Sequence, residues 1–366
     1  MGPRTAAVVL LLASLGAGDE ARREIDKRNE AYAGDIERYF RESLVEQYPA
    51  RAAKAWNRSY TSPRAFLKSV EPNRARYRRM FSPPDLKPTG PLRREPFPGV
   101  EGVKAEWLTL PLGTLRADAL LAIPENAAGP VPLVIAQHGI GSFPERVFGV
   151  DDPGNSYHKY GRALVEEGFA VLAPMNLFTV EKRNRMERLA RLADTTLPGI
   201  ELVRVQRLLD EVLKDKRIDR ERVGMWGISL GGMATMFWTP LEPRIKCGIV
   251  TAWFNHRRNK MVIPDKRYSC FLETKEEHAF FRGWLTEFTD SDVVSLICPR
   301  PLMVQTGKKD GIAWWPQAVE EFEAAKEHYR RLGIEDRIEM TLHEGGHEIH
   351  LESGLRFLKK WLLRTP

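Results

Sequence analysis

The stretch Val223-Gly-Met-Trp-Gly227-Ile-Ser229-Leu-Gly231-Gly232 decides the fold. Its first residues are apolar, as in a short buried strand, and the residues after Ser229 continue in a helical pattern. A turn of this kind forces strained backbone angles on the serine, and a Cβ at position 227 or 231 would clash with the neighbouring chain. The segment therefore predicts a strand, a tight turn and a helix, with the Ser229 hydroxyl exposed at the carboxyl end of the strand.

Short apolar strands alternate with amphipathic helices on both sides of this turn. The predicted strands span residues 103–110, 117–123, 131–137, 169–173, 223–226, 245–250, 301–306 and 337–342. The predicted helices between them span residues 157–167, 199–215, 230–238, 316–332 and 352–364. Such alternation predicts an α/β fold, in which a mostly parallel eight-stranded sheet is covered by helices on both faces.

The chain ahead of residue 101 has a different character. Residues 1–18 carry one basic residue, Arg4, then a ten-residue apolar run and small residues, which is typical of a secretory signal peptide. Residues 19–100 are predicted to form a helical arm that turns into a proline-rich extended connector at residue 82. The catalytic domain is then expected to span residues 101–366, with an insertion at about 252–298.

Charge and hydropathy narrow the possible partners. The net charge of +7 comes from the residues ahead of 101, where acidic residues are interspersed with the basic ones. This mixture favours a solvated helix face over a nucleic-acid surface.

The apolar run in residues 1–18 is too short to span a bilayer, so we expect no membrane anchor. The predicted signal peptide implies a periplasmic or extracellular location. The alternative is that the first residues are simply the start of the first helix. Three cysteines allow at most one disulfide and one free thiol after export.

A nucleophilic serine needs a base and a carboxylate that orients the base. Asp310 follows the predicted strand 301–306, and His347 follows the predicted strand 337–342. Ser229, Asp310 and His347 are therefore the predicted catalytic residues. Asp290 and Asp292, which follow no clear strand, are the alternative acids.

The third strand ends in a turn that is suited to hold a developing oxyanion. The sequence His138-Gly139-Ile140-Gly141 follows this strand and presents backbone N–H groups toward the serine. We predict that the amides of Ile140 and Leu230 form the oxyanion hole, with Gly139 as a competitor for Ile140.

A competing motif overlaps the predicted base. The sequence His343-Glu-Gly-Gly-His347 matches the His-Glu-x-x-His pattern of zinc proteases, which needs both histidines on one helical face. Each of the two glycines would cost about 1 kcal/mol inside a helix, and the residues before His343 are typical of a strand. We therefore predict no metal site.

Taken together, these segments resemble the α/β-hydrolase superfamily, and more narrowly its dienelactone-hydrolase-like and acetyl-xylan-esterase-like branch. The resemblance covers about residues 100–365 and rests on the following motifs: Gln137-His-Gly-Ile-Gly141, Tyr157-His158, Gly168-Phe-Ala-Val-Leu-Ala-Pro174, Arg222–Gly232, Pro299-Arg-Pro301 and Gly345-Gly-His-Glu348. It implies a serine acyl-enzyme mechanism without a cofactor. Dienelactone hydrolases use a cysteine nucleophile, so the serine favours the esterase side of the branch.

The insertion supplies the candidate substrate residues. Trp253, His256 and Arg257 follow the sixth strand, and Trp314 lies close to Asp310. These aromatic residues suit stacking on sugar rings, and Arg257 or Arg258 suits a carboxylate. The alternatives are a lid packed over the core and ordinary salt bridges. We expect an exported serine esterase that acts on a small-molecule or carbohydrate ester. A serine peptidase and an inactive binding protein of the same fold remain alternatives, and the oligomeric state is left open.

Overall fold

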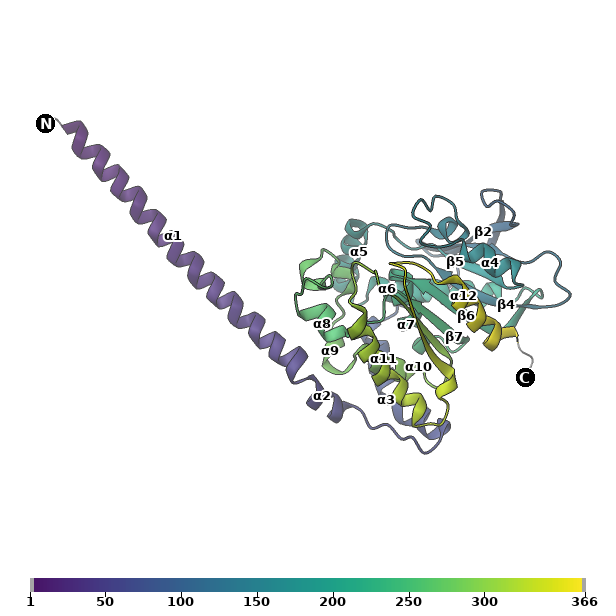
Figure 1. Cartoon of the computed structure of the whole chain (residues 1–366). Coiled ribbons are helices and arrows are strands. Elements are labelled where there is room, and N and C mark those ends of the chain that lie inside the picture. The colour runs from purple at the N-terminus through teal and green to yellow at the C-terminus, as the bar shows by residue number, and fades with distance from the viewer. Residues whose placement is uncertain (1–2, 364–366) are drawn as a thin grey trace. The chain divides into compact units, whose positions relative to one another are not determined.

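The computed structural model describes residues 3–363, with side chains described from residue 18 onward. The chain divides into two compact units, Met1–Ala50 and Arg51–Pro366. The first unit holds helix α1 (Pro3–Arg41) and a short π-helical turn, η1 (Glu42–Glu46) (Figure 1). The signal peptide predicted for residues 1–18 lies outside the described side chains except at Gly18, and it remains a prediction.

One nine-stranded sheet forms the centre of the second unit (Figure 1). Its strand order is β1-β2-β3-β5-β4-β6-β7-β8-β9. The strands are β1 (Arg93–Phe97), β2 (Ala105–Leu112), β3 (Leu115–Ala122), β4 (Val131–Gln137), β5 (Ala170–Pro174), β6 (Ile218–Ile228), β7 (Ile245–Thr251), β8 (Leu302–Gly307) and β9 (Ile338–His343). The pairs β1–β2, β2–β3 and β3–β5 are antiparallel, and the pairs from β5–β4 to β8–β9 are parallel. The predicted α/β fold is therefore confirmed.

Strand β1 corrects the predicted number of eight strands. It lies in the segment that was predicted to be a connector, and it pairs only with β2, at the edge of the sheet. Its residues are largely exposed, so no apolar alternation marks it in the sequence. Pro96 is tolerated there because an edge strand has one side without a hydrogen-bonding partner strand.

Helices cover both faces of the sheet. The five predicted helices correspond to α4 (Tyr160–Glu166), α6 (Leu197–Val212), α7 (Leu230–Trp238), α11 (Trp315–Arg330) and α12 (Leu351–Leu358). On strand β7, Cys247 and Ile249 join the core cluster that contains residues of α4 and α12. Gly248 lies between these two residues on the strand and therefore faces the other side of the sheet. A Cβ at Gly248 would meet Thr235 of α7, so α7 covers that side.

Helix α5 (Val180–Leu192) was not predicted, because its buried face is mostly polar. Arg183 on this face is fully buried and forms a bidentate ion pair with Glu201 of α6, with N–O distances of 2.6 and 3.0 Å. A helix that buries charged residues gives no apolar periodicity to detect.

Helix α3 (Pro63–Phe81) belongs to the second unit. Ser62 caps its N-terminus by accepting a hydrogen bond from the amide of Ala65, and Pro63 occupies the first turn. The helix buries four large side chains completely: Phe66, Val70, Tyr77 and Phe81. This part of the predicted arm therefore contributes to the core of the second unit. Helix α2 (Tyr48–Ala55) precedes it.

The predicted insertion is a set of short helices between β7 and β8. They are α8 (Arg257–Val262), η4 (Phe271–Glu273), η5 (Glu277–Ala279), α9 (Trp284–Glu287) and α10 (Asp290–Ile297). Its centre is the fully buried ion pair of Arg257 with Asp290. The three cysteines, Cys247, Cys270 and Cys298, are free and buried.

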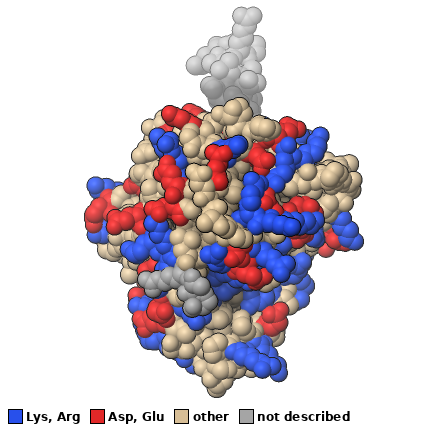
Figure 2. Space-filling model, turned by 90° about the vertical axis from the view of Figure 1, so that its right-hand side faces the viewer, with Lys and Arg blue, Asp and Glu red and all other residues tan. Residues whose placement is uncertain are grey.

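Acidic and basic side chains are interspersed over the face shown in Figure 2. Ion pairs of the chain include Arg222 with Asp219 and Arg162 with Glu166. Within the described part of the chain, no helix combines the length and the apolar character needed to cross a membrane.

Candidate active site

Ser229 lies in the turn between β6 and α7, at the carboxyl end of the sheet. Its φ and ψ are 58° and −118°, which is a strained conformation for a residue with a side chain. A Cβ at Gly227 would lie 2.1 Å from the carbonyl oxygen of Gly231, and one at Gly231 would lie 2.1 Å from that of Gln137. The predicted strain at the serine and the need for both glycines are therefore confirmed.

Asp310 and His347 are hydrogen-bonded to each other. The Nδ1 atom of His347 lies 2.8 Å from Oδ2 of Asp310, and the other carboxylate oxygen accepts the amide of Ile312 at 3.0 Å. The Asp310 side chain is almost completely buried, whereas His347 is about one-third exposed. Because Nδ1 faces a carboxylate, it carries the proton, and Nε2 is left as the basic nitrogen of the ring.

Close backbone packing brings the loops of these two residues together. The amide of Lys308 donates to the carbonyl of His343 at 2.8 Å, and that of Lys309 donates to Gly345 at 2.9 Å. A Cβ at Gly307 would lie 2.1 Å from the carbonyl oxygen of Gly346. Only glycine at position 307 allows this approach, which sets the spacing between the carboxylate and the imidazole.

The two alternative acids have other partners. Asp290 is fully buried and binds the Arg257 guanidinium through both oxygens, while it also accepts the amide of Asn255. Asp292 belongs to the capping box at the start of α10 and pairs with Arg58. The structure thus brings Asp310, and neither of these aspartates, to His347.

Ile140 and Leu230 line the same cavity as Ser229. Leu230 is the first residue of α7, so its N–H group has no acceptor within the helix. On either side of Ile140, the amide of Gly139 donates to the Tyr157 hydroxyl at 2.8 Å, and that of Gly141 donates to Phe178 at 2.7 Å. Since the Gly139 amide is already engaged, Ile140 and Leu230 remain the predicted oxyanion donors.

His138, in the same turn, is a buried residue whose ring is hydrogen-bonded to the backbone. Its Nε2 atom accepts the amide of Asn176 at 3.2 Å, and its side chain is fully buried. Burial lowers the pKa of His138 to about 4, so the ring is neutral at physiological pH.

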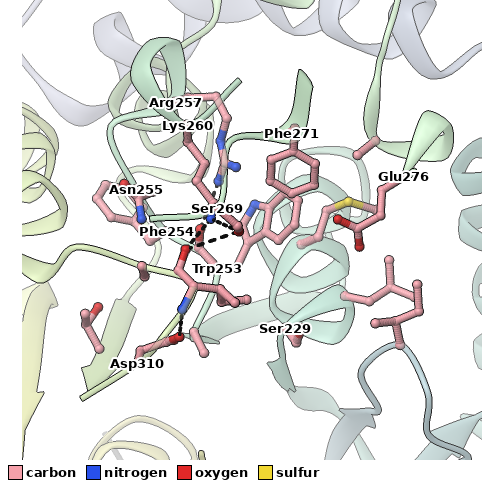
Figure 3. Close-up of a pocket in the computed structure, with 18 of the residues that line it drawn as sticks. Ser229, Trp253, Phe254, Asn255, Arg257, Lys260, Ser269, Phe271, Glu276 and Asp310 are labelled. Atoms are coloured by element: carbon pink, nitrogen blue, oxygen red, sulfur yellow. Dashed lines mark hydrogen bonds between the residues drawn. The ribbon is translucent and has the colours of Figure 1, made fainter. Parts of the chain in front are cut away.

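The cavity beside Ser229 is walled largely by the insertion (Figure 3). Its volume is about 60 Å³, enough for a few water molecules. Of the predicted substrate residues, Trp253 and Arg257 line it. Arg257 directs Nε and Nη2 to Asp290 and leaves Nη1 without a partner among the described residues.

The other two predicted substrate residues do not line this cavity. His256 caps α8, and its Nδ1 atom accepts the amide of Asn259 at 3.4 Å. Trp314 packs beneath the Arg267 guanidinium, with 3.8 Å between the guanidinium carbon and the ring centre.

Sequence reasoning missed three ionisable residues of the cavity, Lys260, Glu276 and His278. Figure 3 labels the first two. Lys260 Nζ donates to Ser269 Oγ at 2.7 Å, and burial together with the Arg257 charge lowers the pKa of Lys260 to about 8. Burial raises the pKa of Glu276. Lys260 and Glu276 lie in an insertion whose sequence shows no clear periodicity. The sequence therefore does not distinguish charged residues that line a cavity from those on the surface.

The His-Glu-x-x-His sequence is not helical in the structure. His343 ends strand β9, and the following residues, including His347, form a loop. The two imidazoles are therefore not presented four residues apart on one helix face. Among the described residues, no group of three or more His, Cys, Asp or Glu side chains is placed to hold a metal ion.

Comparison with known proteins supports the fold described above. Residues 202–364, which contain Ser229, Asp310 and His347, match the Prolyl oligopeptidase family. The structure is similar to that of a "putative acetyl xylan esterase" from Bacteroides fragilis, with a TM-score of 0.62, 18% identity and 78% of each chain covered. The chain has an α/β-hydrolase fold.

Two further matches support the resemblance. A glucuronoyl esterase from Solibacter usitatus shares the α/β-hydrolase fold with a TM-score of 0.57 and 16% identity, over 80% of this chain and 93% of that one. The "Putative hydrolase YtaP" of Bacillus subtilis is 25% identical over 275 residues, or 70% of this chain and 88% of the relative. The resemblance to the α/β-hydrolase superfamily is confirmed, and the matches indicate a hydrolytic enzyme.

Proposed function

We propose that this chain is an exported serine esterase that hydrolyses carboxylic esters through an acyl-enzyme on Ser229. The observation that carries the proposal is the meeting of three elements at the carboxyl edge of the sheet. Ser229 lies at a strained strand-to-helix turn, Asp310 lines the same cavity, and His347 binds Asp310 through Nδ1 at 2.8 Å. This combination supports acyl transfer more directly than any other chemistry.

The proposed reaction follows from the available protons and lone pairs. His347 Nε2 takes the proton from the Ser229 hydroxyl as its oxygen attacks the ester carbonyl. The amides of Ile140 and Leu230 donate to the resulting oxyanion. The intermediate collapses, and the alcohol leaves with the proton from His347. A water molecule, activated by the same histidine, then hydrolyses the acyl-enzyme and regenerates the serine.

The polar residues of the cavity favour an alcohol that is rich in hydroxyl groups. Asp290 neutralises Arg257, and Glu276 lies in the same cavity as Lys260. The cavity thus offers both donors and acceptors with little net charge, which suits sugar hydroxyls better than a free carboxylate. We therefore propose an acylated carbohydrate as the substrate and set aside a uronate carboxylate bound by Arg257. The neighbouring structure named "putative acetyl xylan esterase" agrees with this choice, because the sugar is the alcohol of an acetyl ester.

Replacing Glu276 with glutamine should separate sugar binding from ester chemistry. The substitution keeps the shape but removes the charged acceptor, and we expect KM for acetylated xylo-oligosaccharides to rise about fivefold. The kcat/KM for p-nitrophenyl acetate should stay within about twofold, because that alcohol has no hydroxyl groups to bind. Glu273→Gln, an exposed carboxylate three residues earlier, is the matched control. Equal losses on both esters would contradict the carbohydrate assignment.

The same assay should include other acyl substrates, because the family match also favours a peptidase. Acetylated xylan, pectin, glucuronoyl esters and simple alkyl esters test the esterase proposal, and an aminoacyl-nitroanilide tests the peptidase. Cleavage of the nitroanilide at a rate comparable to the esters would favour the peptidase. Cleavage of none would favour an inactive binding protein.

Export predicts a processed N-terminus. If residues 1–18 form a signal peptide, protein recovered from a secreting host should begin near Asp19, as determined by N-terminal sequencing or intact mass. Recovery of the secreted protein with Met1 still present would contradict the signal peptide.

A further inference from the structure

The turn formed by residues 152–158, here the bracket turn, contacts two loops of the proposed active site. It precedes α4 and contains the Tyr157-His158 pair. None of its residues lines the cavity beside Ser229. Two adjacent side chains of the turn make these contacts, one to the oxyanion loop and one to the histidine loop.

Tyr157 holds the oxyanion loop. Its hydroxyl oxygen accepts the amide of Gly139 at 2.8 Å, and both groups are buried. A Cβ at Gly139 would lie 3.1 Å from this hydroxyl and 3.2 Å from the Cβ of Ser229, so the loop is confined between the tyrosine and the nucleophile. The position of the next amide, that of Ile140, therefore depends on Tyr157.

His158 holds the histidine loop through Glu348. His158 Nε2 lies 2.9 Å from one oxygen of Glu348, and the other oxygen accepts the amide of Gly346 at 2.9 Å. Asn155 donates to His158 Nδ1 at 3.1 Å, so Nε2 carries the proton toward Glu348. A backbone bond from Ile349 to the carbonyl of Ser156, at 2.9 Å, fixes the far side of His347.

The bracket turn is itself firmly fixed. The Asp152 carboxylate accepts the amides of Ser156 at 3.2 Å and of Tyr157 at 3.0 Å. Asn155 and His158 in this turn, and Lys159 directly after it, all have φ values near +50°, a region that residues with side chains occupy uncommonly. A turn held in this way can keep the two loops that it contacts at a fixed distance from each other.

We propose that Tyr157, His158 and Glu348 are positioning residues, which set the distance between the oxyanion amides and the catalytic imidazole. The inference rests on the proposed serine mechanism, because it assigns the base to His347 and an oxyanion donor to Ile140. It adds to that mechanism a single structural element that aligns both groups with Ser229.

Two substitutions at Glu348 separate its two contacts. Glu348→Gln keeps an oxygen that accepts the amide of Gly346 but turns an NH₂ group toward the His158 N–H. Glu348→Ala removes both contacts. We expect kcat for p-nitrophenyl acetate to fall about tenfold in Glu348→Gln and in His158→Leu, with KM within twofold. In Glu348→Ala we expect a larger fall in kcat, again with KM within twofold.

The double variant His158→Leu/Glu348→Gln should be no worse than either single one, because both substitutions remove the hydrogen bond between His158 and Glu348. Tyr157→Phe should also lower kcat with little change in KM.

Labelling of Ser229 by a sulfonyl fluoride, followed by intact mass, provides a readout that does not depend on the ester. The labelling rate should fall in parallel with kcat. Glu106→Ala is the matched control, because Glu106 on β2 pairs at a similar exposure with Arg94 on the edge strand β1. It should label at the wild-type rate.

The outcomes distinguish the two proposals. If the wild-type protein neither labels at Ser229 nor cleaves an ester, the proposed function fails. If the wild type labels and folded Glu348→Ala keeps wild-type kcat and labelling, the positioning role is wrong. A lower melting temperature with unchanged kcat would likewise overturn it, since the contacts would then serve stability alone.

Discussion

Replacing Ser229 with alanine should abolish nearly all ester hydrolysis, with a loss in kcat of about 10³–10⁶-fold. The reason is that no other hydroxyl can occupy the strained turn beside the cavity, where Ser229 has φ 58° and ψ −118°. Folding should be unaffected, because the backbone N–H of residue 229, which donates to Thr251 at 2.9 Å, is retained. Hydrolysis of p-nitrophenyl acetate, with circular dichroism and melting temperature as folding checks, measures the effect.

The double variant Ser229→Ala/His347→Ala provides the internal control. Residues that transfer one proton act as a unit, so the double variant should be scarcely worse than either single one. A strong chelator should leave wild-type activity unchanged, whereas a serine-directed sulfonyl fluoride should abolish it. Full activity in a folded Ser229→Ala variant would refute the serine mechanism.

The fold was predictable because the patterns that indicate it are short segments of the sequence, mostly runs of apolar residues. Strands β4, β5 and β7 are runs of apolar residues that are buried almost throughout, and the glycines at 227 and 231 mark the tight turn. The order of Ser229, Asp310 and His347 could also be read from the sequence, since each follows a predicted strand. At the carboxyl edge of a parallel sheet, such residues come together irrespective of their separation along the chain.

The parts that escaped prediction depend on long-range partners. Strand β1 is an exposed edge, and the buried face of α5 is mostly charged and polar, with Arg183 neutralised by Glu201 of the neighbouring helix α6. Arg257 looked like a ligand for substrate because its partner Asp290 is 33 residues away. Lys260 and Glu276 were overlooked because nothing in the sequence reveals that Lys260 is buried and Glu276 half-buried.

Asp310→Asn is expected to lower kcat by about 10³–10⁴-fold without unfolding the protein. The Asp310 carboxylate accepts a hydrogen bond from the Nδ1–H group of His347 at 2.8 Å and another from the amide of Ile312 at 3.0 Å. An asparagine can satisfy one of these donors with its oxygen, but its NH₂ group then faces the other. If it faces the imidazole, it stabilises the tautomer that carries the proton on Nε2, which cannot accept a proton from the serine. The kcat for a short ester is the measurement.

Asp290→Asn is the contrasting variant, because it separates catalysis from stability. Asp290 compensates the fully buried Arg257 guanidinium, and its loss should destabilise the fold by about 3–5 kcal/mol. Denaturant unfolding should reveal this loss, whereas kcat per folded molecule should stay close to the wild-type value. The opposite result, a folded Asp310→Asn with near-wild-type kcat and an inactive Asp290→Asn, would show that the acid of the triad is Asp290. The 2.8 Å bond between Asp310 and His347 would then be structural, and Arg257 would have to move to free the carboxylate.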